Sequence, residues 1–95
     1  MAGYIIATIE VTDPEKFEVY RGQVPATIEK HGGRYLVRGG QVQVVEGDQP
    51  ERRTVVLEFD SLEKAREWYY SDDYAGPKEL RIQSTVSNVM IVEGL

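Results

Sequence analysis

The order of strand-like and helix-like segments limits the fold of this chain more than any other feature. Apolar residues alternate, as in β-strands, over residues 4–11, 34–38, 53–59 and 86–93. Amphipathic helical segments separate the first strand from the second and the third from the fourth. The order is β-α-β-β-α-β, and the right-handed crossover rule then predicts an α+β, ferredoxin-like fold with a four-stranded antiparallel sheet and helices on one face.

The first helical segment has clear start and stop signals. Asp13 suits the N-cap and Pro14 the first helical position, while the glycines of residues 31–33 end the helix. The residues expected to form its apolar face are Phe17, Tyr20 or Arg21, Val24 and Ile28. Because Gly22 and Pro25 interrupt this pattern, we expect a kink or a break over residues 21–25.

The region after the second strand is rich in glycine. Gly39 and Gly40 predict a bend or bulge, after which residues 42–46 are expected to continue the strand. Residues 47–50 have the composition of a turn before the third strand begins.

The second helical segment is expected in two parts. Ser61 suits its N-cap, and residues 71–73 interrupt it. The apolar face of the first part consists of Leu62, Ala65, Trp68 and Tyr69. A short third helix is expected after Gly76 and Pro77, and it should reach about Ser84.

Both faces of the first and third strands are apolar, although helices can cover only one face of the sheet. The second face is expected to have Tyr4, Ile6, Val56 and either Met90 or Ile91. An exposed apolar patch of this kind usually marks an interface. We therefore expect one domain over residues 1–95 that forms a homodimer through the open sheet face, with two stacked sheets making a dimeric α+β barrel.

Charge and composition exclude several classes of partner. The net charge is −5 and the isoelectric point about 4.8, which argues against nucleic acid or an anionic membrane as a partner. No apolar stretch approaches the roughly 18 residues needed to span a bilayer, and no basic region precedes an apolar run at the N-terminus. A cytoplasmic protein is the expectation.

The composition also speaks against a metal or a bound cofactor. The chain lacks cysteine, and one histidine with scattered carboxylates does not make a transition-metal cluster. Gly32-Gly33 and Gly39-Gly40 do not match a phosphate-binding or dinucleotide-binding loop, so a helix stop and a strand bend explain them better. We expect neither a metal nor a cofactor.

The aromatic group near the end of the second helical segment is the main candidate for a binding site. It consists of Trp68, Tyr69, Tyr70 and Tyr74. Arg81 follows Tyr74 by seven residues and can share a helix face with it, while Tyr20 lies on the inner side of the first helix. These residues could line a pocket for a flat, polar or anionic small molecule. The structural alternative is a solid core whose tyrosine hydroxyls reach the surface.

Two further sets of residues have a structural and a functional interpretation. His31 is the single histidine and thus a candidate general base, but its place at a helix end favours a role in satisfying the last carbonyls. Arg34 and Arg38 are expected on one strand face, and Glu58 is expected to form an ion pair with one of them.

Several segments together resemble a known family. They are DPEKFEVY (13–20), Pro25, GGRYLVRGG (32–40), EFDSLEKAREWYYSDDY (58–74) and VEG (92–94). Over nearly its whole length the chain resembles the domain-of-unknown-function family numbered 1330, which is similar in fold to the dimeric α+β-barrel superfamily. That superfamily includes cofactor-free monooxygenases, muconolactone-type isomerases, stress-responsive barrels and haem-degrading enzymes. The resemblance implies the fold and the dimer, but no activity.

The residues matching that pattern are the expected ligand-binding residues: Tyr20, Arg38, Trp68, Ser71, Tyr74 and Arg81. Three functions stay open. The first is a small-molecule-binding barrel with a pocket between helices and sheet. The second is a cofactor-free oxygenase, isomerase or cyclase acting on a small aromatic or enolisable substrate, in which His31 or a carboxylate moves a proton. The third is a non-enzymatic dimeric assembly module.

Overall fold

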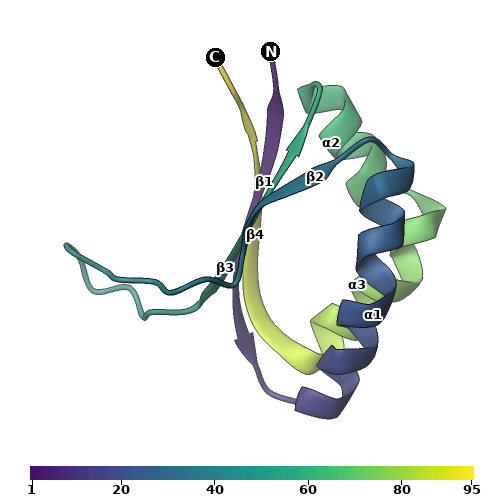
Figure 1. Ribbon diagram of the computed structural model, residues 1–95. Helices are drawn as coiled ribbons and strands as arrows, with labels where there is room; N and C mark the ends of the chain where they lie inside the picture. The colour runs from purple at the N-terminus through teal and green to yellow at the C-terminus, as the bar shows by residue number, and fades with distance from the viewer.

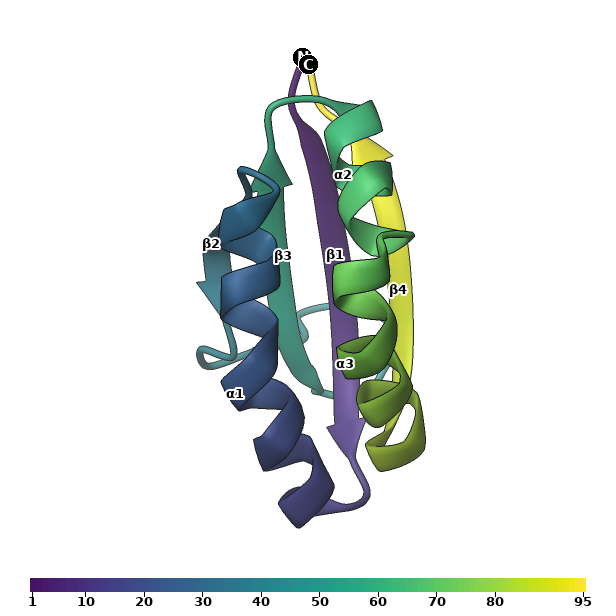
Figure 2. The same ribbon diagram turned by 90° about the vertical axis from the view of Figure 1, so that its right-hand side faces the viewer.

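The computed structural model describes residues 1–95 and has a four-stranded sheet with three helices on one face (Figures 1 and 2). The elements in chain order are β1 (Gly3–Val11), α1 (Pro14–Lys30), β2 (Arg34–Arg38), β3 (Arg53–Phe59), α2 (Leu62–Tyr69), α3 (Asp72–Ser84) and β4 (Thr85–Glu93). The predicted β-α-β-β-α-β order is confirmed, with the second helical segment divided into α2 and α3. None of the helices is long and apolar enough to cross a membrane.

The sheet has the strand order β2-β3-β1-β4, and all neighbouring strands are antiparallel. Ile6 on β1 lies opposite Val56 on one side and Met90 on the other, so these three side chains share the face away from the helices. Met90, and not Ile91, is therefore the β4 residue of this open face. The ferredoxin-like fold with helices on one side is confirmed.

The core lies between the helices and the other face of the sheet. It combines alternate residues of β1 and β3 with the inner faces of the three helices. Its buried apolar residues are Ile5, Ala7, Ile9, Phe17, Tyr20, Val24, Ile28, Leu57, Phe59, Ala65, Trp68 and Tyr74.

Helix α1 is continuous from Pro14 to Lys30, so the break expected over residues 21–25 does not occur. Pro25 lies inside the helix, where the loss of one backbone hydrogen bond costs about 3 kcal/mol. The buried stripe that runs along the whole helix offsets this cost, because the four residues of its apolar face all pack into the core. Asp13 caps the helix by accepting a hydrogen bond from the backbone nitrogen of Lys16.

Helix α3 begins at Asp72, earlier than the start predicted after Pro77. Ser71 is its N-cap, and its hydroxyl accepts a hydrogen bond of 3.2 Å from the backbone nitrogen of Tyr74. Asp72 and Asp73 form the first turn, where negative charge favours the positive end of the helix dipole. Because this cap and the two acidic residues set the start, Pro77 lies inside the helix.

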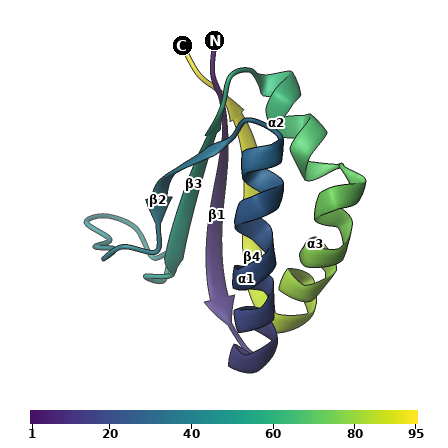
Figure 3. The ribbon, with the colours of Figure 1, turned by 45° about the vertical axis from the view of Figure 1, so that its right-hand side comes forward.

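Strand β2 ends at Arg38, so the strand expected over residues 42–46 is absent. Gly39 has a φ of 72°, which turns the chain away from the sheet after its backbone nitrogen bonds to the carbonyl of Thr54. Residues 40–52, here called the arm, make no backbone hydrogen bond to other backbone groups. The arm projects from the sheet on the side opposite the helices (Figures 1 and 3).

A bulge in β2 changes the direction of its side chains. Tyr35 lies opposite Leu57, but Val37 lies opposite Val56, so the register shifts by one residue around Leu36. A bulge of this kind reverses the faces that the following residues occupy.

The bulge separates the two arginines that were expected on one face of β2. Arg34 lies opposite Glu58 on the open face, whereas Arg38 lies opposite Val55 on the face toward the helices. The prediction of a shared face is wrong because it assumed an uninterrupted alternation. The predicted ion pair of Glu58 is confirmed with Arg34, at 2.6 Å between Nη2 and Oε1.

Candidate functional site

A cavity of about 50 Å³ lies between the helices and the sheet and is partly open to solvent. Helices α1 and α3 run side by side over it, with the sheet beneath (Figures 2 and 3). Its wall is mainly apolar and aromatic. The predicted ligand-binding residues that line it are Tyr20, Arg38, Trp68, Tyr74 and Arg81.

Stacked aromatic rings form one wall of the cavity. The ring centroids of Trp68 and Tyr74 are 4.0 Å apart with an interplanar angle of 30°, and Tyr69 lies 5.8 Å from Tyr74. The indole nitrogen of Trp68 donates a hydrogen bond of 3.0 Å to the hydroxyl of Thr27 on α1. Because the one polar atom of Trp68 is satisfied there, its ring can serve as an apolar wall.

Arg81 and two tyrosines form a buried hydrogen-bond chain beside this wall. The Nε of Arg81 donates to the hydroxyl of Tyr74 at 3.2 Å, and that hydroxyl lies 3.0 Å from the hydroxyl of Tyr20. The Nη1 of Arg81 also donates to the hydroxyl of Ser87 on β4, at 2.6 Å. Arg81 is only 5% exposed. The spacing of seven residues thus places Tyr74 and Arg81 on one helix face, as predicted.

The hydrogen bonds among Arg81, Tyr74 and Tyr20 leave one hydrogen-bond donor unused. The hydroxyls of Tyr20 and Tyr74 have one hydrogen each, and only one of the two can lie in the bond between them. Arg81 donates to Tyr74 and cannot accept. Whichever tyrosine donates to the other, one phenolic hydrogen has no acceptor in the protein. The chain therefore offers a hydrogen-bond donor to a bound molecule.

The charges around the cavity are all positive. Arg38, Arg53 and Arg81 line it and make no ion pair with a carboxylate, and no Asp or Glu is among the lining residues. Arg21 also lines it, but its guanidinium pairs with Glu18 at 3.2 Å near the surface. Outside the cavity, Arg34 and Arg52 each pair with a carboxylate.

Two of these arginines lie over aromatic rings. The guanidinium of Arg38 is 4.5 Å from the ring centre of Tyr35, and that of Arg53 is 5.9 Å from the ring centre of Phe17. The Nε of Arg53 is buried without a hydrogen-bond partner. Arg53 is therefore a cation with an unused donor beside the cavity.

The pKa shifts of the buried groups keep Tyr20 and Tyr35 neutral and Arg81 charged. Burial, reinforced by the neighbouring Tyr74, raises the pKa of Tyr20 far above its ordinary value. Burial also raises the pKa of Tyr35. For Arg81, burial acts to lower the pKa, but the hydroxyl oxygens of Tyr74, Tyr20 and Tyr69 together offset it and the pKa is raised. At neutral pH the site is a set of donors with one buried positive charge.

Two of the candidate residues lie outside the cavity. Ser71 caps α3 and donates a hydrogen bond of 2.7 Å to the carbonyl of Trp68, so it positions Tyr74 and Trp68 without lining the cavity. His31 is the C-cap of α1, and its Nε2 lies 3.1 Å from Asp73 Oδ2. Its side chain thus links α1 to α3 and does not bond to the last carbonyls of α1.

The sequence patterns did not single out Arg53, Tyr35 or Ser87. Arg53 and Ser87 are both opposite Ile9 of β1, on the side of the sheet that the helices cover. Only the strand register shows that these positions meet, since the three residues are far apart in the chain. Tyr35 could have been found from its alternation with Arg34, which faces the other way.

A metal site has little support in the side chains. No group of three or more His, Asp or Glu side chains is placed to hold a metal ion. The donors around the cavity are guanidinium groups and phenols, which suit an anionic or oxygen-rich organic ligand better than a cation.

Comparison with solved structures shows proteins of the same fold. A protein of unknown function from Rhodopseudomonas palustris is 16% identical with a TM-score of 0.77, over 99% of this chain and 82% of that chain. A dimeric ferredoxin-like protein of unknown function from Jannaschia sp. CCS1 is 9% identical with a TM-score of 0.68, over 100% and 99%.

SnoaB, a cofactor-independent oxygenase from Streptomyces nogalater, is 10% identical with a TM-score of 0.62, over 99% of this chain and 93% of that chain. At these identities the likeness shows the fold alone. A comparison with curated proteins found no match. The family model for a domain of unknown function, DUF1330, matches residues 2–95. Since this match covers nearly the whole chain, the protein belongs to the DUF1330 family.

Proposed function

We propose that the protein is a homodimer that binds a small planar anion in the cavity of each protomer. The observation that carries this proposal is the state of Arg81, a guanidinium that is 5% exposed and has no carboxylate partner. Its protein partners are the neutral hydroxyls of Tyr74 and Ser87. A buried charge without a counter-ion is costly, and proteins seldom keep one for stability alone.

The positive charge of the cavity contrasts with the negative net charge of the whole chain. The chain has more acidic than basic residues, with 16 Asp and Glu against 11 Lys and Arg, yet the cavity has no acidic residue. A bound anion would neutralise Arg81 and accept hydrogen bonds from it. The guanidinium is a planar fork of donors, which fits a carboxylate or a similar planar oxyanion.

The walls indicate the shape of the ligand. The stacked rings of Trp68 and Tyr74 leave a flat apolar surface, and the unused phenolic hydrogen of the Tyr20–Tyr74 pair offers a second polar contact. A cavity of about 50 Å³ holds a few water molecules and suits a small ligand rather than a drug-sized one. An aromatic or conjugated acid of one ring has the required features.

A homodimer through the open sheet face is the second part of the proposal. Residues of this face such as Val37 and Val92 are exposed large apolar side chains, and the adjoining Met90 is 57% exposed. The similar Jannaschia protein is itself dimeric. Light scattering should give twice the mass of one 10.8 kDa chain, and a mass of one chain at micromolar concentration would contradict the dimer.

A thermal-shift screen tests the ligand-binding part. The probes are one-ring aromatic acids, quinones and lactones, and we expect the aromatic acids to raise the melting temperature. The variant Arg81→Met should lose this shift. The matched control is Arg66→Met, since Arg66 is an exposed arginine of α2 that does not line the cavity.

Two results would overturn the proposed binding site. One is a screen in which no acid shifts the melting temperature of the natural protein. The other is an Arg81→Met variant that is folded and keeps the same acid-induced shift as the Arg66→Met control.

A cofactor-free oxygenase, isomerase or cyclase acting on an aromatic or enolisable substrate is the second candidate. The hydrogen-bond chain favours it, because a phenolic hydrogen and a guanidinium together stabilise a developing enolate or phenolate oxygen. The fold similarity to the oxygenase SnoaB is compatible with it. However, no His, Asp or Glu lines the cavity to remove a proton, and the raised pKa of Tyr20 makes it a poor base. Binding without catalysis therefore has the better support.

An oxygen electrode and proton-exchange measurements separate the two candidates. Oxygen uptake, or exchange of the α-hydrogen of a cyclic ketone into heavy water, should stay at the background rate if the cavity only binds. A rate above background that Tyr74→Phe and Arg81→Met both abolish would show catalysis. Absence of both binding and turnover would leave the assembly module as the remaining function.

A further inference from the structure

The polar contacts of the arm, residues 40–52, with the rest of its protomer are at its end, where Arg52 pairs with Glu10 at 3.7 Å and its carbonyl accepts a hydrogen bond from the hydroxyl of Thr54. No backbone hydrogen bond joins the arm to other backbone groups, and its tip is open to solvent, with Val45 82% exposed. A bond of 3.3 Å from the backbone nitrogen of Val44 to the carboxylate of Glu51 links its two sides. Long loops without secondary structure are uncommon in a compact domain, and those that occur often have a function. The backbone groups of the arm are free to form hydrogen bonds with a second chain.

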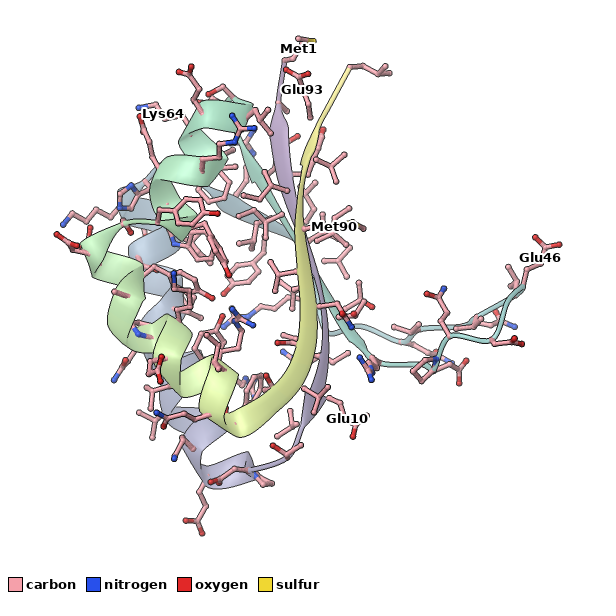
Figure 4. The ribbon with its side chains drawn as sticks, turned by 180° about the vertical axis from the view of Figure 1, so that it is seen from behind. Met1, Glu10, Glu46, Lys64, Met90 and Glu93 are labelled. Atoms are coloured by element: carbon pink, nitrogen blue, oxygen red, sulfur yellow. The ribbon has the colours of Figure 1, made fainter.

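The arm points toward the place that a second copy would occupy. It leaves the sheet on the side opposite the helices (Figure 1), and Figure 4 shows Glu46 at its tip far from the sheet. In the same view Met90 points from β4 to the side on which the arm projects. The arm and the open apolar face therefore lie on one side of the molecule.

The edge of the sheet formed by β4 has both unpaired backbone groups and exposed apolar side chains that an extended arm could contact. In the order β2-β3-β1-β4 this strand pairs only with β1, so its outer side has unpaired backbone groups. Its residues Val86 and Met90 are exposed by 51% and 57%, and Val92 continues this row on the open face. A long edge strand with an apolar row invites another strand.

We propose that each arm lies against β4 of a second copy and adds a strand there, so that two chains exchange arms. This proposal rests on the homodimer proposed above. Residues 40–45 span about 20 Å when extended, and the nine residues of β4 span about 30 Å, so the arm can cover most of the edge.

The side-chain pattern of the arm agrees with this role. Gln41 and Gln43 alternate with Val42 and Val44, so that an extended arm has an apolar side and a polar side. The valines would face the apolar row of the partner's β4, and the glutamines would face water. Main-chain hydrogen bonds would supply affinity and the valines the register, as in other cases of strand addition. Reciprocal exchange gives the closed two-fold arrangement that most homodimers have.

The absence of cysteine makes the contact testable by site-specific cross-linking. Chains with Val45→Cys are mixed with mass-tagged chains that have Met90→Cys, allowed to exchange, and treated with a short bis-maleimide. The expected product is a cross-link between the two kinds of chain. The control pairs Val45→Cys with Lys64→Cys on α2, which lies on the helix side in Figure 4 and should give no product.

A second measurement removes the arm. In this variant a two-residue Asn-Gly turn replaces residues 40–52, a change that removes no residue of the strands or helices. Sedimentation should give a dimer dissociation constant at least tenfold higher than that of the natural chain.

The outcomes distinguish the arm from the dimer. If the natural chain is dimeric but the cysteine variants give no cross-link between positions 45 and 90, or the variant without the arm keeps the same dissociation constant, the arm exchange is overturned and the homodimer stands. Products that join Val45 to Val45 in place of Met90 also overturn it, since the arms would then meet each other. A monomeric natural chain overturns both.

Discussion

The hydroxyl oxygens of Tyr20 and Tyr74 lie 3.0 Å apart in the protein interior, where they join α1 to α3 beside the cavity. The two residues are 54 positions apart in the chain. Since Arg81 donates to one of them, the pair connects a buried positive charge to both of the long helices. Tyr74 therefore makes two side-chain hydrogen bonds and Tyr20 makes one, so the two residues should contribute differently to stability.

Replacing Tyr74 should destabilise the fold more than replacing Tyr20. Tyr74→Phe removes the bonds to both Tyr20 and Arg81 and leaves Arg81 Nε buried without an acceptor, so a loss of about 2–3 kcal/mol is expected. Tyr20→Phe removes one bond, and about 1 kcal/mol is expected. Urea unfolding measures both. A larger loss for Tyr20→Phe would mean that Arg81 does not depend on Tyr74.

Arg81 should contribute to binding and not to the stability of the free protein. We expect Arg81→Met to unfold at the same or a higher urea concentration than the natural chain, because a similar-sized apolar group replaces a buried charge that lacks a counter-ion. A destabilisation above about 2 kcal/mol would instead assign Arg81 a structural role through Tyr74 and Ser87.

Asp73 should stabilise the protein at neutral pH and lose this effect in acid. Hydrogen bonds from Lys30 and His31 hold the pKa of Asp73 below its ordinary value of 3.8. The unfolded chain therefore binds the proton first, and the stabilisation is complete above about pH 4 and disappears as the pH falls through the folded-state pKa.

The variant Asp73→Asn tests this pH dependence. It should be less stable than the natural chain at pH 7, and the difference should shrink steadily below pH 4. Asp72→Asn is the control, since Asp72 lies in the same first turn of α3 but makes no ion pair. Equal effects of the two variants at pH 7 would assign the stabilisation to the helix dipole alone.

Tyr20 should make the fold sensitive to alkali. Burial, assisted by Tyr74, raises the pKa of Tyr20 well above its ordinary value of 10.0. Above pH 10 the unfolded chain releases this proton and the folded chain does not, so the free energy of unfolding falls as the pH rises. Ultraviolet titration of the phenols should show Tyr20 ionising only when the protein unfolds. Ionisation of all six tyrosines before the loss of structure would contradict this.

Gly39 should tolerate a side chain less well than its neighbour Gly40. Gly39 has a φ of 72°, and a Cβ there would collide with the guanidinium of Arg53. We expect Gly39→Ala to destabilise the protein by about 1–2 kcal/mol and to move Arg53. Gly40→Ala is the matched control, because nothing lies within 4 Å of its added Cβ. Similar unfolding curves for the two variants would show that the turn adapts.

The periodic patterns predicted most of the fold because the burial of apolar residues determines both the sequence pattern and the arrangement of the elements. The alternation in β1 and β3 and the stripe of α1 follow from which residues face the core. The prediction failed where a helix-breaking residue, such as a proline, was outweighed by burial or by a nearby helix cap. Pro25 does not end α1, since the buried residues Val24 and Ile28 lie before and after it on the helix, and Ser71 starts α3 before Pro77 can.

The site was predictable only in part. Tyr74 and Arg81 share a helix face, so their spacing was sufficient to place them together. Arg38 lines the cavity, but it does so from a strand face other than the one expected, because a bulge leaves no mark in the alternation. Arg53 needed the pairing of β3 with β1, and no local pattern contains that information.

The bulge near Leu36 makes the composition of the cavity wall depend on the number of residues in β2. One additional residue decides whether the guanidinium of Arg38 reaches the cavity or the opposite side of the sheet. Related proteins that gained or lost a single codon in this strand would remove the guanidinium of Arg38 from the cavity wall while Arg53 and Arg81 and the other lining residues stayed the same. Ligand preference among such relatives should therefore follow insertions and deletions in β2, and a comparison of amino-acid identities alone would miss it.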